Sequence, residues 1–315
     1  MSTYLRTQPI EAEIGPTGQL SIRITSSDTR IRAIEGGVAR VRASFSIGAG
    51  SDAEADRIFD QCQLRVSRGP GSLAVAEPEK RSRDTRAEAE LEVEAPIGCS
   101  LRFEGVSADV SVSGLHGEQR YRTVSGDLLL NDAGGDLRIN GVSADVTVRA
   151  RGQLSLANTA VSGDLSAIAP RFVALQATSV SGDVEVEGAF AASGEHRVET
   201  VSGDLAVGLV GAATFEVRGM STDISCRLPN EQQGGADRRR VIVGGGGPTF
   251  SFSSMSGDLS IRPPQRLAAN EPPPPQAATA DAAVDQLAIL RALERGEIDV
   301  EEATRRLADA GPTHG

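Results

Sequence analysis

Apolar and polar positions alternate with a period of two along most of the first 262 residues. Leu20, Ile22 and Ile24 stand two apart, and the same alternation runs through residues 38–45. Because successive side chains of a strand point to opposite faces, this spacing predicts β-strands that are buried on one face. The alternation stops at residues 52–62, where Asp52 stands near a helix N-cap position, and we expect one short helix there.

A five-residue unit, Val-Ser-Gly/Ala-Asp-Leu/Val, recurs eight times, and Met replaces Val in the last two copies. Successive Asp residues of the unit are 18, 18, 19, 19, 21, 19 and 35 residues apart. Steps near 20 residues are too short for a pair of helices and are typical of one coil of a β-solenoid. We interpret the long last step as an inserted loop, 229–247, with an added strand at 241–243.

The parity of the unit predicts which side chains face the core. In the copy at 124–128, Val124, Gly126 and Leu128 are expected to point inward, and Ser125 and Asp127 outward. The third position is Gly five times, Ala twice and Thr once. Since Ala and Thr resist a positive φ, this position is predicted to need a small inward residue rather than a left-handed turn.

The outward Asp side chains are expected to form a column, because adjacent strands lie about 4.8 Å apart. Carboxylates at that spacing repel one another, so the repeat needs an explanation. One interpretation is structural: each Asp accepts a hydrogen bond from a neighbouring Ser hydroxyl or a turn N–H. The other is a cation-binding column formed by Asp109, Asp127, Asp145, Asp164, Asp183, Asp204, Asp223 and Asp258. Calcium-binding nonapeptide repeats need Gly-rich Asp loops on both sides of each coil, and only one Asp recurs here, so we expect no metal.

The pattern divides the chain into four segments. Residues 1–100 are predicted to be a β-rich N-terminal cap, because an open solenoid end would expose strand edges and apolar core. Residues 101–262 form the solenoid repeats, and residues 263–281 are a Pro- and Ala-rich linker without a core. Residues 282–310 are predicted to form a helical hairpin with a turn at Gly296.

Two helices of this length cannot bury enough apolar surface by themselves. We therefore expect the hairpin to bind a protein partner or a second copy of the chain. The candidate partner-binding side chains are those of its apolar stripe: Leu287, Leu290, Leu293, Val300 and Leu307.

Composition narrows the function. Aromatic residues make up only 3% of the chain, which favours a thin aliphatic core. The net charge of −11 argues against a nucleic-acid partner, since phosphate binding needs clustered Lys and Arg. The three His residues are far apart, so no His-based catalytic triad is expected, and we predict a protein with neither catalytic residues nor a cofactor.

The location predicted from the sequence is the cytoplasm. Cys62, Cys99 and Cys226 are odd in number and widely spaced, which is typical of buried thiols in a reducing compartment and excludes a disulfide framework. The first residues lack the apolar segment of a signal peptide, and no run of 18 apolar residues could cross a membrane. Contact with a membrane would then be peripheral, through a membrane protein.

The repeated unit, the helix at 52–62 and the segment Leu91-Glu-Val-Glu-Ala-Pro-Ile-Gly resemble the bacterial DUF4097 family, also called the toastrack domain and labelled as an adhesin. The resemblance covers residues 10–262, and the tail at 290–307 looks like the SHOCT-like helical modules that accompany such domains. It implies a right-handed β-solenoid without known catalytic residues, in proteins associated with cell-envelope stress systems. The adhesin label implies surface exposure, which does not match a chain without an export signal.

These observations favour an interaction scaffold or adaptor that combines a rigid solenoid with a tethered hairpin. Two alternatives stay open. A polymerising solenoid resembling bactofilins would stack end to end, which the N-terminal cap and the hairpin oppose. A carbohydrate-active β-helix would need aromatic platforms, which this composition scarcely provides.

Overall fold

The computed structural model describes residues 2–78, 87–235 and 238–265. The chain separates into two compact units, Met1–Leu267 and Ala268–Gly315, and the account below concerns the first. The predicted hairpin at 282–310, and all but the first three residues of the predicted linker, lie outside the described residues.

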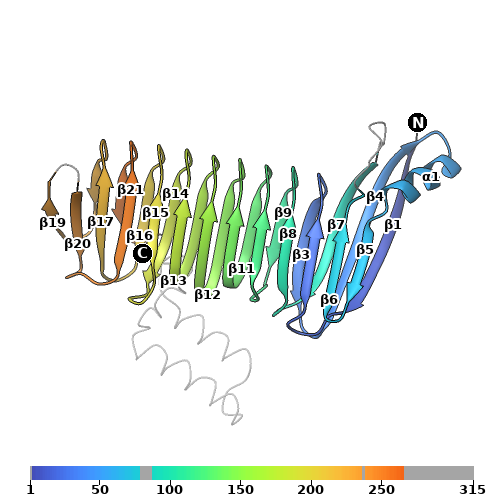
Figure 1. The fold of residues 1–315 in the computed structure, drawn as a ribbon, viewed down its shortest axis with the longest axis horizontal. Coiled ribbons are helices and arrows are strands. Elements are labelled where there is room, and N and C mark those ends of the chain that lie inside the picture. Colours follow the sequence, from blue (N-terminus) through green and yellow to red (C-terminus); the bar gives the residue numbers. More distant parts are fainter. Residues whose placement is uncertain (1, 79–86, 236–237, 266–315) are drawn as a thin grey trace, which may run out of the picture. The chain divides into compact units, whose positions relative to one another are not determined.

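The first unit is a β-solenoid with two layers of strands, which stand side by side along its length (Figure 1). The first layer contains, in spatial order, β1 (Ser2–Glu13), β4 (Val38–Ala49), β7 (Ala87–Pro96), β3 (Asp28–Ile34), β9 (Val110–Ser113), the first halves of β11 (Leu128–Asn140), β12 (Val146–Thr159) and β13 (Leu165–Thr178), β14 (Val184–Phe190), β16 (Leu205–Leu209), β22 (Leu259–Arg262) and β18 (Ile224–Cys226).

The second layer contains, in the same direction, β5 (Arg65–Gly69), β6 (Ser72–Ala76), β2 (Gln19–Arg23), β8 (Ser100–Glu104), β10 (Gln119–Arg122), the second halves of β11, β12 and β13, β15 (His196–Glu199), β21 (Thr249–Ser254), β17 (Ala213–Gly219), β20 (Arg238–Val243) and β19 (Asn230–Gly234). The prediction of an all-β solenoid is confirmed, and its right-handed winding stays a prediction.

Coils of the central part stack in parallel and in register, so that equivalent apolar residues lie above one another. Leu128, for example, pairs with Val110 on one side and Val146 on the other. Antiparallel strands close both ends: β1, β4 and β7 at the N-terminal end, and β17, β20 and β19 at the other. The predicted helix is α1 (Asp52–Cys62), whose Phe59 ring packs edge-on against Phe45 of β4 at 5.3 Å. Its N-cap is Ser51, one residue earlier than expected.

Chain order and spatial order differ at both ends of the stack. The coil formed by β21 and β22 lies between the coil of β15 and β16 and the coil of β17 and β18, although it comes last in the sequence. At the other end, β2 and β3 pair directly with β8 and β9, and β6 and β7 lie outside them. The long last step of the repeat is therefore more than a loop with one strand. It contains two strands, β19 and β20, and precedes an inserted coil.

The core between the layers is mainly aliphatic, as the low aromatic content predicts. Leu130, Val148, Leu154 and Val186 are fully buried within it. A cluster of aromatic side chains lies towards the C-terminal end, where the rings of Phe190 and Phe250 have centroids 5.1 Å apart. This narrow core fixes the distance between the layers, and with it the geometry of the two edges where the chain passes from one layer to the other.

Candidate functional site

All copies of the repeated unit lie along one edge of the solenoid, where the chain leaves the second layer and enters the first. We call it the motif edge. The first residue of each copy was predicted to face the core, and this prediction was wrong. The six valines are 42–50% exposed, Met255 is 57% exposed and Met220 is 86% exposed. The regular strand begins only at the fifth residue of a copy, as at Leu128, so the parity of the strand does not extend back across the turn.

The exposed first residues form a continuous row, the aliphatic ridge, whose spatial order is Val106, Val124, Val142, Val161, Val180, Val201, Met255 and Met220. Each following Ser fixes this order, because its backbone N–H donates to the carbonyl of the ridge residue in the preceding coil. The N–H of Ser125 donates to Val106 at 2.8 Å, and that of Ser221 donates to Met255 at 3.2 Å.

The Ser residues form a second column beside the ridge. Isolated parallel bridges join Ser107, Ser125, Ser143, Ser162 and Ser181 in order. The hydroxyl oxygens of Ser107 and Ser125 lie 3.2 Å apart, and those of Ser143 and Ser162 lie 3.0 Å apart. The backbone of the motif edge is therefore held from coil to coil and offers a rigid base for the ridge.

The third position of the unit needs a small residue because the coils approach one another closely there, as predicted. A Cβ on Gly203 would lie 2.2 Å from the carbonyl oxygen of Gly182. The prediction that no left-handed conformation is needed was wrong in two copies. Gly126 has a φ of +100° and Gly163 a φ of +109°, values that Gly adopts far more readily than other residues.

The Asp residues form a hydrogen-bonded ladder. The structural interpretation of the column is confirmed, and the donors are backbone N–H groups of the turn. In six steps, Oδ1 of one Asp accepts the backbone N–H of the next at 2.8–2.9 Å. The bonded pairs, acceptor first, are Asp109–Asp127, Asp145–Asp164, Asp164–Asp183, Asp183–Asp204, Asp204–Asp258 and Asp258–Asp223. The side chain thus replaces a backbone carbonyl at the turn.

The ladder has a ninth member, which the recurrence of the five-residue unit did not reveal. Asp28 accepts the N–H of Asp109 at 3.4 Å, and Ser107 donates to the carbonyl of Thr25 at 2.8 Å. Residues 25–29, Thr-Ser-Ser-Asp-Thr, therefore form a copy of the unit without its Val and Gly. The Ser-x-Asp core was the signal that could have revealed it, because Ser27 takes the buried third position.

Two grooves border the Asp ladder on the first layer. A groove of about 440 Å³ is lined by Asp28, Asp109, Asp127 and Asp145, and one of about 800 Å³ continues it past Asp164, Asp183, Asp204 and Asp258. Within residues 2–78, 87–235 and 238–265, no group of three or more His, Cys, Asp or Glu side chains is placed to hold a metal ion. One oxygen of most ladder carboxylates is already engaged by an amide, so the geometry favours a structural role.

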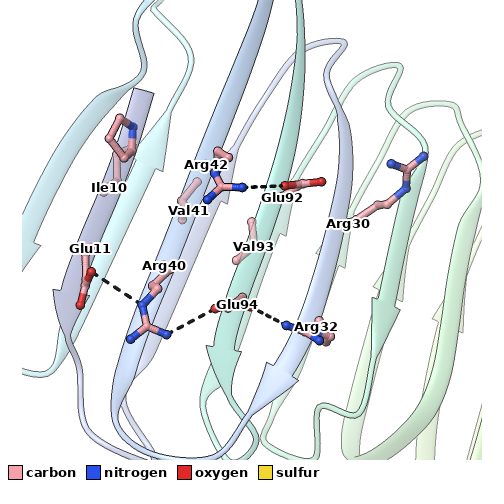
Figure 2. A pocket seen from close by; sticks show the side chains of 11 residues that line it. Ile10, Glu11, Arg30, Arg32, Arg40, Val41, Arg42, Glu92, Val93 and Glu94 are labelled. Carbon is pink, nitrogen blue, oxygen red and sulfur yellow. Dashed lines mark hydrogen bonds and ion pairs between the residues drawn. The ribbon is translucent and has the colours of Figure 1, made fainter. Parts of the chain in front are cut away.

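A third groove, of about 530 Å³, lies on the outer face of the N-terminal strands (Figure 2). Ion pairs cross it from strand to strand: Arg40 lies 3.7 Å from Glu11 and 3.3 Å from Glu94, which also pairs with Arg32 at 2.5 Å. Hydrogen bonds from Arg32 and Arg40 lower the pKa of Glu94 below its ordinary value. The carboxylates and guanidinium groups of this groove pair with one another, which is typical of a solvated sheet face.

Several thiols and one imidazole are buried or half-buried. Cys62 and Cys99 are buried and Cys226 is half-buried, and burial raises the pKa of Cys99 to about 11. His196 is buried among Phe190 and neighbouring rings, and this burial lowers its pKa, although its hydrogen bond with the Ala191 carbonyl at 2.9 Å acts in the opposite direction. None of these residues belongs to a copy of the repeated unit.

Residues 17–196, more than half of the 315-residue chain, match the family described as Toastrack DUF4097. The chain belongs to the DUF4097 toastrack family. No curated protein matches it. Within the toastrack domain that the structure describes, no helix is long and apolar enough to cross a membrane.

Three solved structures are similar to this toastrack protein, and all three are distant from it in sequence. A "putative adhesin" from Parabacteroides merdae is 11% identical, with a TM-score of 0.33, over 82% of this chain and 95% of the other. A "putative adhesin" from Bacteroides fragilis is 14% identical, with a TM-score of 0.29, over 81% and 97%. A "putative cell adhesion protein" from Clostridium sporogenes is 9% identical, with a TM-score of 0.25, over 82% and 99%.

Proposed function

We propose that this toastrack protein is a non-enzymatic interaction scaffold whose binding surface is the motif edge. One observation carries the proposal. Of the eleven large apolar side chains that are exposed among the described residues, eight belong to the aliphatic ridge. Contiguous exposed apolar surface on a soluble domain is typical of a site of interaction, whereas scattered apolar residues need no explanation.

The ridge side chains contribute little to the core. The third and fifth residues of a unit are never exposed, and in several copies they pack fully inward, as Ala144 and Val146 do. The first residue lies outside, and the hydrogen bond at its carbonyl does not depend on its side chain. The chain should therefore fold equally well with a polar residue at this position, so the repeated Val and Met support a role in binding.

We further propose that the protein acts as an adaptor in cell-envelope stress signalling from the cytoplasm, with the 282–310 hairpin as a second binding element. The family resemblance supports the stress association, and buried thiols support a reducing compartment. The hairpin residues proposed to contact the partner are Leu287, Leu290, Leu293, Val300 and Leu307.

A pull-down from extract of the native host tests the binding surface. The test variant carries Val142→Ser, Val161→Ser and Val180→Ser, which interrupt the middle of the ridge. The matched control carries three Ser substitutions at the exposed apolar residues outside the ridge, namely Leu5, Ile97 and Val210. Loss of a specific partner from the ridge variant alone supports the proposal. Recovery of the same proteins by both variants contradicts it.

A second comparison separates the hairpin from the ridge. The full chain and residues 1–262 are used in the same pull-down, with circular dichroism to verify that the shortened chain keeps its β-structure. A partner lost only on truncation identifies the hairpin as its binding element. A partner retained by residues 1–262 and lost from the ridge variant assigns binding to the motif edge.

A further inference from the structure

The aliphatic ridge has a fixed period, which limits what can cover it. Its members belong to successive coils, and adjacent strands lie about 4.8 Å apart. We propose that the occupant is the ridge of a second copy of this chain, with the two solenoids parallel and their N-terminal ends together. This inference rests on the proposed function of the motif edge and names its partner.

The first argument is the match of periods. An α-helix advances about 5.4 Å per turn, so its apolar side chains would drift by about 0.6 Å per coil and by about 4 Å over the seven steps of the ridge. An extended strand fits less well, since its same-face side chains are about 6.7 Å apart. A second ridge has the same period, so each of its side chains can lie against its equivalent in the first at every step.

The second argument is the charge beside the ridge. On the first-layer side stands the Asp ladder, with one exposed Asp for each ridge residue. On the second-layer side, two residues before each ridge residue, stands a column with two acidic, two basic and four uncharged members. Its members are Glu104, Arg122, Asn140, Thr159, Thr178, Glu199, Ser253 and Arg218, and none of them is buried.

This asymmetry selects the orientation. Two ridges related by a two-fold axis parallel to the ridge run in the same direction, and each Asp ladder then faces the neutral column of the other copy. With the axis perpendicular to the ridge, the copies run in opposite directions and the two Asp ladders face each other. Like charges brought together at an interface oppose association, so the parallel arrangement is favoured.

The third argument is size. Seven steps give the ridge a length of about 34 Å, and the five residue steps from the neutral column to the Asp ladder span at most about 17 Å, because the turn of the motif shortens them. The contact area is therefore below roughly 580 Å² per partner, less than the 800 Å² of a standard interface, so we expect a weak, concentration-dependent dimer.

Sedimentation velocity of the full chain between 1 and ~200 μM tests the association. We expect a monomer–dimer equilibrium. The variant with Val142→Ser, Val161→Ser and Val180→Ser should raise the dissociation constant at least tenfold, and the off-ridge control with Ser at Leu5, Ile97 and Val210 should leave it unchanged.

Orientation is measured by electron paramagnetic resonance on Val106→Cys with a nitroxide label, in a Cys226→Ser background. In the parallel dimer the two labels at position 106 lie at the same end, within about 20 Å of each other. In the antiparallel dimer they lie at opposite ends, separated by at least ~34 Å, the ridge length.

Three results would overturn the inference. A full chain that stays monomeric throughout excludes a second copy as the occupant, while loss of a host partner from the ridge variant would leave the proposed function standing. A dimer that the ridge substitutions do not weaken forms through another surface. A dimer with the long label distance refutes the parallel orientation.

Discussion

Asp164 has two opposing effects on stability, and substitution separates them. Its Oδ1 accepts the backbone N–H of Asp183 at 2.9 Å, which favours the fold. Its charge also stands between those of Asp145 and Asp183, one coil away on each side, which disfavours it. Asp164→Asn keeps an acceptor oxygen in place and removes the charge. Asp164→Ala removes both.

The magnitudes follow from the geometry of the ladder. Two unit charges about 4.8 Å apart in water repel by about 0.9 kcal/mol, so two neighbours cost Asp164 up to ~1.8 kcal/mol before screening by salt. A hydrogen bond to a neutral acceptor contributes about 1 kcal/mol. We therefore expect Asp164→Asn to be more stable than the unmodified protein by up to ~1 kcal/mol at low salt, and Asp164→Ala to be about 1 kcal/mol less stable than Asp164→Asn.

Urea unfolding followed by far-ultraviolet circular dichroism measures both differences, at low salt and near 0.5 M NaCl. The advantage of Asp164→Asn over the unmodified protein should shrink at high salt, because exposed charges are then screened. The difference between the Ala and Asn variants should persist, because it reports the hydrogen bond. Equal stability of these two variants at both salt concentrations would refute the idea that the ladder carboxylates stabilise the turn.

Three further predictions concern the core and its edge. Gly203→Ala should lower the free energy of unfolding by about 1–3 kcal/mol in urea, because its Cβ would lie 2.2 Å from a carbonyl oxygen of the neighbouring coil. Acidification from pH 7.5 to 5.5 should lower the thermal midpoint less in His196→Phe than in the unmodified protein. Burial lowers the pKa of His196 in the folded state. At a pH below the unfolded pKa, which is about 6.5, the unfolded chain therefore binds the proton preferentially, and the folded state loses stability. A thiol reagent at pH 8 should label Cys226 first, and only in denaturant label the two buried thiols, Cys62 and Cys99.

Each of these has a control or an outcome that would contradict it. Gly152→Ala should be tolerated, because nothing lies within 4 Å of its Cβ position; a loss equal to that of Gly203→Ala would contradict the close-approach argument. For His196, an equal fall of the thermal midpoint in His196→Phe and in the unmodified protein would contradict the argument from burial. Labelling of a Cys226→Ser variant at the original rate would show that a buried thiol is accessible in the native state.

The sequence was enough to predict the solenoid, because eight copies of one unit at a coil-length spacing leave few alternatives. It could not predict which way Val124 points. Strand parity holds only where the backbone is extended, and the motif backbone turns between the Val and the fifth residue, with Gly126 at a φ of +100°. The ridge, which is the candidate site, was therefore assigned to the core. Asp28 was not recognised as a member of the ladder, because its copy of the unit lacks the first Val and the Gly or Ala third residue of most other copies.

The position of β21 and β22 was equally beyond a reading of the sequence. Spacing along the chain says how many residues separate two copies, and it says nothing of which coils become neighbours. Only the pairing of Leu259 with Leu205 on one side and Ile224 on the other places the last copy inside the stack. In the sequence, this reversed order of the coils is visible only as the long step of 35 residues between Asp223 and Asp258.

The reversed order of the last two coils protects the C-terminal end of the stack. A simple stack of repeats can peel away one coil at a time from an open end, since each coil touches only its neighbours. Here the chain runs from the outer coil, β17 and β18, through the hairpin of β19 and β20, and then back to the inner coil, β21 and β22. Peeling the end therefore frees a loop rather than a tail, and the stack can close only after residue 262 has been synthesised. The final strand of the domain is the one that closes its end, so the fold can be finished only after the whole solenoid domain has been synthesised.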